Sequence, residues 1–204
     1  MTERKRPGRD EYYMGIAMAV RSRANCRGNK VGALIVVGDR VVSTGYNGTP
    51  SGMTNCLDGG CERCAQREKY RSGTSYDLCI CVHAEQNALL SAARFGIAVE
   101  GGEMFSTMRP CFGCTKELLQ AGIAQVYYLH DWRYPDEAVQ SAYEKLQNRI
   151  PRGLKRVAMT DAEAEWAVSA LREKSIPELQ EAVDPDTGQP TSRVEVHTER
   201  RPRP

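Results

Sequence analysis

The sequence has few aromatic residues, little net charge and no long apolar run. Phe, Trp and Tyr make up 7% of its 204 residues, too few for a surface that stacks nucleic-acid bases. The formal net charge of +2 creates no broad field that would attract nucleic acid or an anionic membrane. The longest aliphatic run, Ala33–Val37, is far too short to span a bilayer. We therefore expect neither a membrane protein nor, from composition, a nucleic-acid-binding one.

The N-terminal residues also lack the pattern of a secretory signal. The first ten residues, MTERKRPGRD, are rich in charge, and no apolar core follows them. Such a chain is expected in the cytoplasm, where disulfides are rare. Eight cysteines are many for a cytoplasmic protein, and clustered cysteines there more often bind metal or act as nucleophiles.

The hydrophobic pattern predicts one α/β domain. A helix capped by Asp10 is followed by a predicted hairpin with strands at 31–37 and 41–46. Beyond the hairpin, helices and strands alternate over segments 84–95, 104–107, 111–121, 124–130, 136–148 and 154–159. Strands that alternate with helices pair in parallel, so the pattern predicts three layers, α/β/α, around a mixed five-stranded sheet.

Four segments divide the chain around and within this pattern. Residues 1–9 are expected to form a flexible basic arm, and 10–160 the main domain. Within that domain, 47–82 form a Cys-rich insertion, too long for a structureless loop unless something ties it down. Residues 161–182 are expected to form a helical extension, and the polar, Pro-rich residues 183–204 a disordered tail.

Two short motifs, His83-Ala-Glu85 and Pro-Cys111-Phe-Gly-Cys114, each open a predicted helix. Cys111 and Cys114 are three residues apart, so both sulfurs can bind one ion from the same helix face. Positions two apart inside a helix point roughly 200° away from each other. His83 and Glu85 can therefore face one site only at the irregular first turn of a helix.

These residues predict a catalytic zinc site. The imidazole of His83 and the thiolates of Cys111 and Cys114 leave the fourth position of Zn²⁺ open to water, whereas structural zinc sites are closed by four protein ligands. Glu85 is then expected to be the proton carrier beside that water. A lone Cys-x-x-Cys can belong to a structural knuckle, but both motifs in this order favour the catalytic interpretation.

Around these motifs the chain resembles the deoxycytidylate (dCMP) deaminase family of the cytidine deaminase-like zinc superfamily. The matching stretches are NKVGALIV, STGYNGTPSG, NCLDGGCERC, CICVHAEQNALL, STMRPCFGCTKELLQAGI and QVYYLHD. The order His-x-Glu, then Pro-Cys-x-x-Cys, is the signature of zinc nucleobase deaminases. The resemblance implies the cytidine deaminase-like fold. It also implies that a zinc-bound hydroxide deaminates dCMP to dUMP and ammonia, feeding thymidylate synthesis.

The resemblance also implies how substrate binds. Asn47 should hydrogen-bond the deoxyribose, the amide of Ala84 should meet the O2 carbonyl of the base, and Tyr134 should line the nucleotide pocket.

Regulation by nucleotides is a further implication of the resemblance. Many family members are homohexamers that dCTP activates and dTTP inhibits, and the loop after the hairpin contributes to their effector site. Here the candidates are Gly45, Gly48 and Gly52, and Mg²⁺ could accompany a nucleotide effector. An ordinary Gly-Pro turn is the competing interpretation of this loop.

A second, closed zinc site could tie the insertion down. Its candidate ligands are the six cysteines outside the catalytic motif: Cys26, Cys56, Cys61, Cys64, Cys79 and Cys81. Cys61 and Cys64 have knuckle spacing, while Cys79 and Cys81 would point to one side of an extended segment. Family members with a second zinc use positions corresponding to Cys26, Cys56 and Cys81. The fourth ligand stays open, and reduced buried cysteines without metal are the alternative.

Arg109 departs from the apolar or small residue that the family carries before Pro-Cys. Two related substrates therefore stay open: a modified deoxycytidylate and a free cytosine nucleoside. From another class, the alternative is a non-catalytic zinc-stabilised nucleic-acid-binding module, which the charge and the scarce aromatics disfavour. His130 is expected to be a packed or surface histidine.

Overall fold

The protein is described here by a computed structural model that covers residues 6–70 and 75–161. The predicted tail at 183–204 and, apart from Asp161, the predicted extension at 161–182 lie outside these residues, as do the first five residues of the predicted arm. The elements up to the insertion are α1 (Arg9–Arg21), β1 (Gly32–Val37) and β2 (Arg40–Tyr46). Those after it are α3 (Ala84–Arg94), β3 (Glu103–Met108), α4 (Phe112–Gln120), β4 (Gln125–His130), α5 (Glu137–Gln147) and β5 (Leu154–Arg156).

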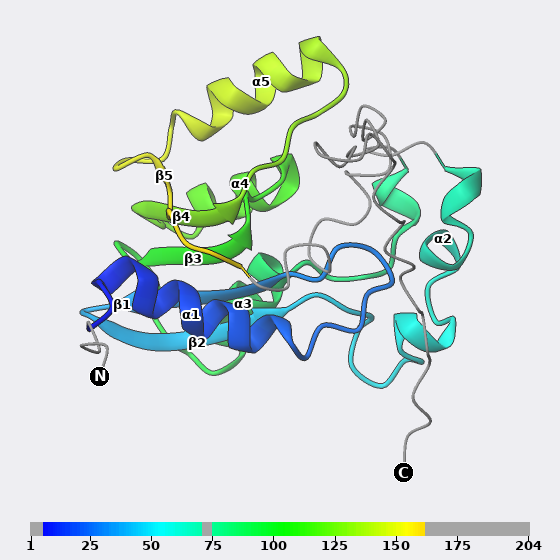
Figure 1. Ribbon diagram of the computed structural model, residues 1–204, viewed down its shortest axis with the longest axis horizontal. Helices are drawn as coiled ribbons and strands as arrows, with labels where there is room; N and C mark the ends of the chain where they lie inside the picture. The colour runs from blue at the N-terminus through cyan, green and yellow to red at the C-terminus, as the bar shows by residue number, and fades with distance from the viewer. Residues whose placement is uncertain (1–5, 71–74, 162–204) are drawn as a thin grey trace, which may run out of the picture. The chain divides into compact units, whose positions relative to one another are not determined.

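The five strands form one mixed sheet in the order β2-β1-β3-β4-β5 (Figure 1). Strand β1 pairs antiparallel with both β2 and β3, whereas β3, β4 and β5 run parallel to one another. The prediction of an opening hairpin followed by parallel strands is confirmed.

Helices cover both faces of the sheet. On one face Met14 of α1 packs in a buried cluster with Leu34 and Phe105. On the other face Ala88 of α3 and Leu118 of α4 pack in a second cluster with strand residues. Full burial of a side chain such as Leu34 or Phe105 contributes roughly 1.5–3 kcal/mol. The predicted three-layer α/β/α architecture is confirmed.

Strand β2 approaches α3 closely at Gly45. A Cβ atom at this position would lie 2.2 Å from the carbonyl oxygen of Ala84 and 2.4 Å from the amide nitrogen of Ala88. Glycine is therefore required here, because any side chain would push the start of α3 away from the sheet. The first turn of α3 carries two of the predicted site residues.

Two local predictions were wrong. Gly8, not Asp10, is the N-cap of α1, and the Glu11 carboxylate accepts a hydrogen bond from the Gly8 amide at 2.8 Å. The described part of the insertion, 47–70 and 75–82, is not loop throughout, because it contains short helical turns. These turns are η1 (Cys56–Asp58), α2 (Glu62–Ala65), η2 (Arg67–Lys69) and η3 (Tyr76–Leu78). Nowhere in the part of the chain described is there a helix long and apolar enough to cross a membrane.

A buried ion pair ties the end of α1 to the segment after β5. The Arg21 guanidinium donates to both carboxylate oxygens of Asp161, at 2.6 and 2.9 Å. Both side chains are only 1% exposed. The Nε2 atom of His130 lies 2.6 Å from Asp161 Oδ2. His130 is thus a packed histidine at the end of β4.

Replacing Asp161 by Ala should lower the free energy of unfolding by about 3 kcal/mol, because it removes a buried carboxylate that accepts two hydrogen bonds from the Arg21 guanidinium. Urea denaturation would measure the change. The control is Asp131→Ala, which removes a 53% exposed partner of Arg109 and should cost less than about 1 kcal/mol. Equal small losses in both variants would show that the buried pair adds nothing to stability.

Candidate metal-dependent active site

The first turns of α3 and α4 bring three potential metal ligands together. The Nδ1 atom of His83 lies 3.4 Å from the sulfur of Cys111 and 3.4 Å from the sulfur of Cys114. Nitrogen and sulfur ligands of one tetrahedral zinc ion lie about 3.5 Å apart. The three ligand atoms, all within 4.8 Å of one another, therefore have the spacing and the chemistry of a zinc site.

Backbone geometry at the two helix starts explains this convergence. His83 is the N-cap of α3, with φ −72° and ψ 159°, and Cys111 is the N-cap of α4, with φ −69° and ψ 176°. An extended N-cap residue turns its side chain across the end of its helix, where the helix dipole favours an anionic sulfur. His83 is the N-cap and Glu85 lies in the regular first turn of α3, and both side chains approach the Cys114 sulfur, Nδ1 at 3.4 Å and Oε2 at 3.6 Å; their sharing of one catalytic site stays a prediction.

Of the three ligands only Cys111 is already shifted toward its metal-binding form, because the hydrogen bond with Cys111 and burial raise the pKa of the Cys114 thiol. The pKa of the Cys111 thiol is lowered to about 4 by its hydrogen bond with Cys114, and His83 acts in the same direction against the effect of burial. Burial would lower the pKa of His83, but the hydrogen bond and charge of Cys111 raise it to about 9. A bound metal needs neutral imidazole and thiolate, so zinc binding would release the His83 proton.

Glu85 lies beside the ligands and is 4% exposed. Its Oε2 atom is 3.6 Å from the sulfur of Cys114, and its Oε1 atom accepts a hydrogen bond from the Ser106 hydroxyl at 2.9 Å. Burial raises the pKa of the Glu85 carboxyl. A buried carboxyl with a raised pKa, next to a metal site, is suited to receiving and returning a proton.

Sequence analysis missed Ser106. This residue is fully buried in β3, in the middle of the stretch EMFSTM. A hydroxyl at a buried strand position needs a hydrogen-bond partner. This need is the sequence signal by which Ser106 could have been found. The structure shows that the partner is Glu85.

Gln86 connects the two ligand-bearing helices and was also missed. Its side-chain oxygen accepts from the His83 amide at 2.9 Å, and its side-chain nitrogen donates to Glu117 of α4 at 2.8 Å. At the start of α4, the carbonyl oxygen of Pro110 accepts from the Tyr143 hydroxyl at 2.6 Å. These hydrogen bonds fix the positions of His83 and Cys111.

Of the predicted substrate residues, Ala84 and Tyr134 lie next to the metal ligands, whereas the contacts of Asn47 are with the α1–β1 loop. Asn47 is 7% exposed. Its side-chain oxygen accepts a hydrogen bond from the Val31 amide, and its side-chain nitrogen donates to the Asn29 carbonyl, both at 2.8 Å, so the side chain bridges the α1–β1 loop. Ala84 is the first residue of α3. Its backbone amide is one of the first N–H groups of the helix, which have no carbonyl partner within the helix. Contacts of Asn47 and Ala84 with a nucleotide stay predictions.

Tyr134 and Arg109 lie on either side of the Cys111 turn. The Tyr134 hydroxyl accepts a hydrogen bond from the amide of Phe112 at 3.0 Å, directly beside Cys111. Arg109 instead donates to Gln147 of α5 at 2.9 Å and to Asp131 at 3.0 Å. These contacts give the unusual Arg109 a structural role between β4 and α5.

The three glycines named for effector binding have different surroundings. Gly45 lies in β2 and packs against the backbone of α3 at Ala84 and Ala88. A Cβ at Gly48 would lie 2.5 Å from the side chain of Asn25, and Gly52 has a positive φ of 85° in a turn. Gly48 also exchanges two backbone hydrogen bonds with Val82, at 2.9 and 3.2 Å, which anchors the residue before His83. Packing or backbone geometry therefore explains why each of these positions is glycine, and effector binding stays a prediction.

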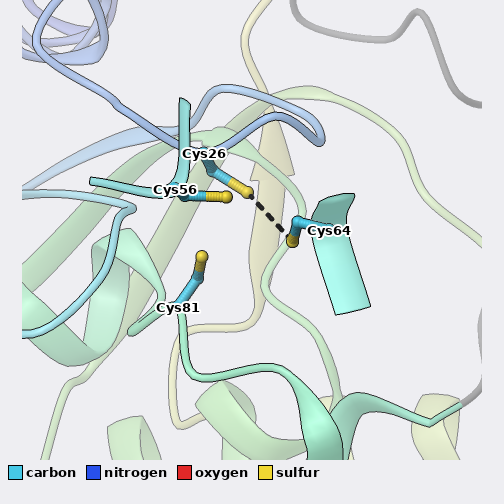
Figure 2. A group of neighbouring side chains, drawn as sticks. All are labelled: Cys26, Cys56, Cys64 and Cys81. Atoms are coloured by element: carbon cyan, nitrogen blue, oxygen red, sulfur yellow. Dashed lines mark hydrogen bonds between the residues drawn. The ribbon is translucent and has the colours of Figure 1, made fainter. Parts of the chain in front are cut away.

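The other six cysteines form a second cluster, and none of the eight cysteines is in a disulfide. The six sulfurs make two overlapping groups of four, with every sulfur of a group within 4.8 Å of the others. The first group, shown converging in Figure 2, is Cys26, Cys56, Cys64 and Cys81. The second group is Cys61, Cys64, Cys79 and Cys81. The whole predicted ligand pool is thus brought together.

Comparison with known proteins agrees with this chemistry. The family model described as "cytidine and deoxycytidylate deaminase zinc-binding region" matches residues 7–130. The deoxycytidylate deaminase of Schizosaccharomyces pombe is 38% identical over 151 residues, which are 72% of this chain and 46% of that protein. The chain therefore spans less than half the length of this fungal relative. The deoxycytidylate deaminase of Mycobacterium phage D29 is 39% identical over 131 residues, covering 60% of this chain and 95% of that protein.

A solved structure is also similar to this one. The crystal structure of the dCMP deaminase from cyanophage S-TIM5, in complex with dCMP and dUMP, aligns with a TM-score of 0.58 and 30% sequence identity. The alignment covers 76% of this chain and 100% of the cyanophage chain.

Proposed function

The chain belongs to the cytidine and deoxycytidylate deaminase zinc-binding family, and from this premise we propose that it hydrolyses dCMP to dUMP and ammonia. The observation that carries the proposal is the convergence of His83, Cys111 and Cys114 beside the buried carboxyl of Glu85. The similar cyanophage enzyme, whose structure holds dCMP and dUMP, supports this choice of substrate.

The residues around the site divide the chemistry between them. Zinc held by His83, Cys111 and Cys114 would supply Lewis acidity to a water molecule. Glu85 would take one proton from that water and give it to the ring nitrogen of cytosine, and would then carry the second proton, from the added hydroxyl that becomes the new carbonyl, to the amino group that leaves as ammonia. The Ser106 hydroxyl donates a hydrogen bond to Oε1 of Glu85. The other oxygen of this carboxyl group, Oε2, lies near Cys114 and would therefore carry the proton.

Substrate contacts follow from the same site. We propose that the Ala84 amide meets the O2 carbonyl of the base, that Asn47 donates to the deoxyribose, and that Tyr134 lines the pocket beside Cys111. The hydrogen bond from Phe112 to Tyr134 supports its location next to the metal ligands.

Assembly and regulation are proposed from the family resemblance. We propose a cytoplasmic homohexamer that dCTP activates and dTTP inhibits, with Mg²⁺ accompanying the effector and Gly45, Gly48 and Gly52 at the effector site. Leu90 and Phe95, 59% and 71% exposed at the end of α3, are suited to a subunit contact. Besides the catalytic zinc, we propose structural zinc in the cysteine cluster. Assays of dCMP turnover with and without each effector would test the regulation.

A substrate panel tests the proposed activity. Ammonia release should show kcat/KM for dCMP exceeding that for cytidine and deoxycytidine by roughly 100-fold or more, because a pocket built for the nucleotide leaves polar groups unpaired with smaller substrates. Modified deoxycytidylates belong in the same panel. A wide preference for cytidine would exclude dCMP as the substrate, and no release from any member would favour the non-catalytic binding module.

Ser106→Ala should lower kcat/KM for dCMP roughly tenfold with zinc content unchanged, because the Glu85 carboxyl loses the hydrogen bond that orients it. Steady-state kinetics and metal analysis would measure both. The matched control is Ser43→Ala. It removes a buried hydroxyl of β2 that donates at 2.7 Å to the carbonyl of Ala88, which lies in α3, the helix that carries Glu85. Its activity should stay within about twofold of wild type. Similar activity losses in both variants would mean that Ser106 acts through helix stability alone.

A further inference from the structure

The six sulfurs of the cysteine cluster have the spacing of two tetrahedra that share an edge. The sulfur–sulfur distance is 3.9 Å for Cys26 and Cys64 in the first group. In the second group it is 3.8 Å for Cys61 and Cys79, and 3.7 Å for Cys64 and Cys79. Thiolates around one tetrahedral zinc ion, with Zn–S bonds of about 2.3 Å, lie about 3.8 Å apart. The printed distances in both groups therefore match the spacing around a zinc ion.

We propose that the cluster is a binuclear zinc site in which Cys64 and Cys81 bridge two ions. One ion is completed by Cys26 and Cys56, the other by Cys61 and Cys79. Both ions are closed by four thiolates, so this site is structural. With the catalytic ion, the chain would carry three zinc ions.

Burial supports a metal-filled centre. The buried residues at the middle of the insertion form a cluster made of cysteines, with Cys79 packed at its edge. Large apolar side chains of the insertion lie outside it and are 38–55% exposed: Met53, Leu57, Leu78 and Ile80. A segment of this length without an apolar core gains too little from burial to order itself, so metal–sulfur bonds would supply the missing stability.

A single zinc ion would leave two cysteines without a role. If it occupied the first group, Cys61 and Cys79 would lie 3.8 Å apart with no ion between them. If it occupied the second, Cys26 and Cys56 would be left over, although both are almost fully buried. Two ions use all six sulfurs.

The surroundings offset the charge of such a cluster. Two divalent ions and six thiolates leave two net negative charges. Backbone amides of Arg27 and Gly28 donate to the sulfurs of Cys56 and Cys26, each at 3.3 Å. The Arg27 guanidinium donates to the Leu57 carbonyl at 3.0 Å, so it is held across the loop beside Cys56. Amide hydrogen bonds and a nearby cation are the supports that thiolate–metal sites require.

The sulfur spacing also selects the kind of metal. In an iron–sulfur cube each thiolate binds a different iron, so the protein sulfurs stand farther apart than ligands of one ion. All sulfurs in each group here lie within 4.8 Å of one another. Four thiolates around one ion suit zinc or a single iron, and zinc is the metal that the matching family model names.

The cluster connects directly to the active site. Cys81 lies two residues before His83, and the intervening Val82 is held by its two hydrogen bonds to Gly48. A fixed Cys81 would therefore determine how the chain enters α3.

Metal analysis of the full-length wild-type chain, purified without chelators, tests the proposal. Three zinc ions per chain are expected. The variant Cys114→Ala should empty the catalytic site and keep two. X-ray absorption of that variant should then show four sulfur ligands per zinc and a zinc–zinc distance of roughly 3 Å, because edge-sharing tetrahedra hold their centres close together.

The other outcomes contradict the proposal. Two zinc ions in wild type and one in Cys114→Ala would show a mononuclear site, and iron with visible absorption would show a different metal. Two zinc ions in Cys114→Ala without a short zinc–zinc distance would exclude bridging sulfurs. These results are independent of dCMP turnover. A chain with three zinc ions that leaves dCMP unchanged would refute the proposed activity but keep the cluster.

Discussion

Glu85→Gln is expected to reduce dCMP turnover by about a thousandfold while leaving the fold and the zinc content unchanged. Glutamine has the same size and can still accept the hydrogen bond from Ser106, but its amide cannot receive and return a proton. General acid–base groups contribute 10²–10⁴-fold to rate, and the proposed mechanism uses this carboxyl for each proton transfer. The expected loss is therefore in kcat, with a smaller change in KM.

Steady-state ammonia release, zinc analysis and thermal unfolding of Glu85→Gln would be measured together. The matched control is Glu137→Gln, which changes an exposed carboxylate in the first turn of α5 that accepts from Arg133. This control should retain activity within a few-fold of wild type. If Glu85→Gln kept more than about a tenth of wild-type turnover, Glu85 could not be the proton carrier.

The sheet was predictable because its signals are local. The hairpin strands around Gly38 and the alternation of helices with strands after residue 83 gave the right elements to within a few residues. The last strand was predicted at 154–159 but ends at Arg156. The cap of α1 was predicted wrongly, because Asp10 lies inside the first turn and the N-cap is Gly8, whose amide donates to the Glu11 side chain.

The catalytic ligands were predictable for a similar reason. His83, Cys111 and Cys114 lie in two short motifs, and each motif stands at a helix start where the geometry of one turn decides what can meet. Ser106 and Gln86 were missed because their partners are distant in sequence: Ser106 is 21 residues from Glu85, and Gln86 is 31 residues from Glu117. Such pairs follow from tertiary packing, which no local pattern records.

The cysteine cluster could be predicted from the sequence only in part. Its six members could be named from the sequence, but spacing alone could not decide which sulfurs share an ion. Cys61 and Cys64 have knuckle spacing, yet Cys64 belongs to both groups and Cys61 to one. The loop from α1 brings Cys26 to Cys64, 38 residues away. The bridging positions therefore emerge only from the fold.

Cys56→Ser is expected to lower the free energy of unfolding by more than about 4 kcal/mol and to reduce the zinc content by at least one ion per chain. Cys56 is fully buried, and a serine hydroxyl is a much weaker zinc ligand than a thiolate. Loss of a structural metal ligand belongs to the few substitutions with effects this large. The damage should concentrate in residues 47–82, because their buried centre consists of cysteines.

Hydrogen exchange would locate the damage, since the amides of η1 and α2 should lose protection before those of β3. Cys114→Ser is the matched control, because it removes a zinc ligand of the same chemistry from the other site. It should abolish turnover yet leave exchange in the insertion unchanged, since a three-ligand site adds less to folding than a closed one. Should Cys56→Ser instead keep wild-type stability and zinc content, the insertion would be ordered without metal. Cys81 would then give His83 no metal-based support.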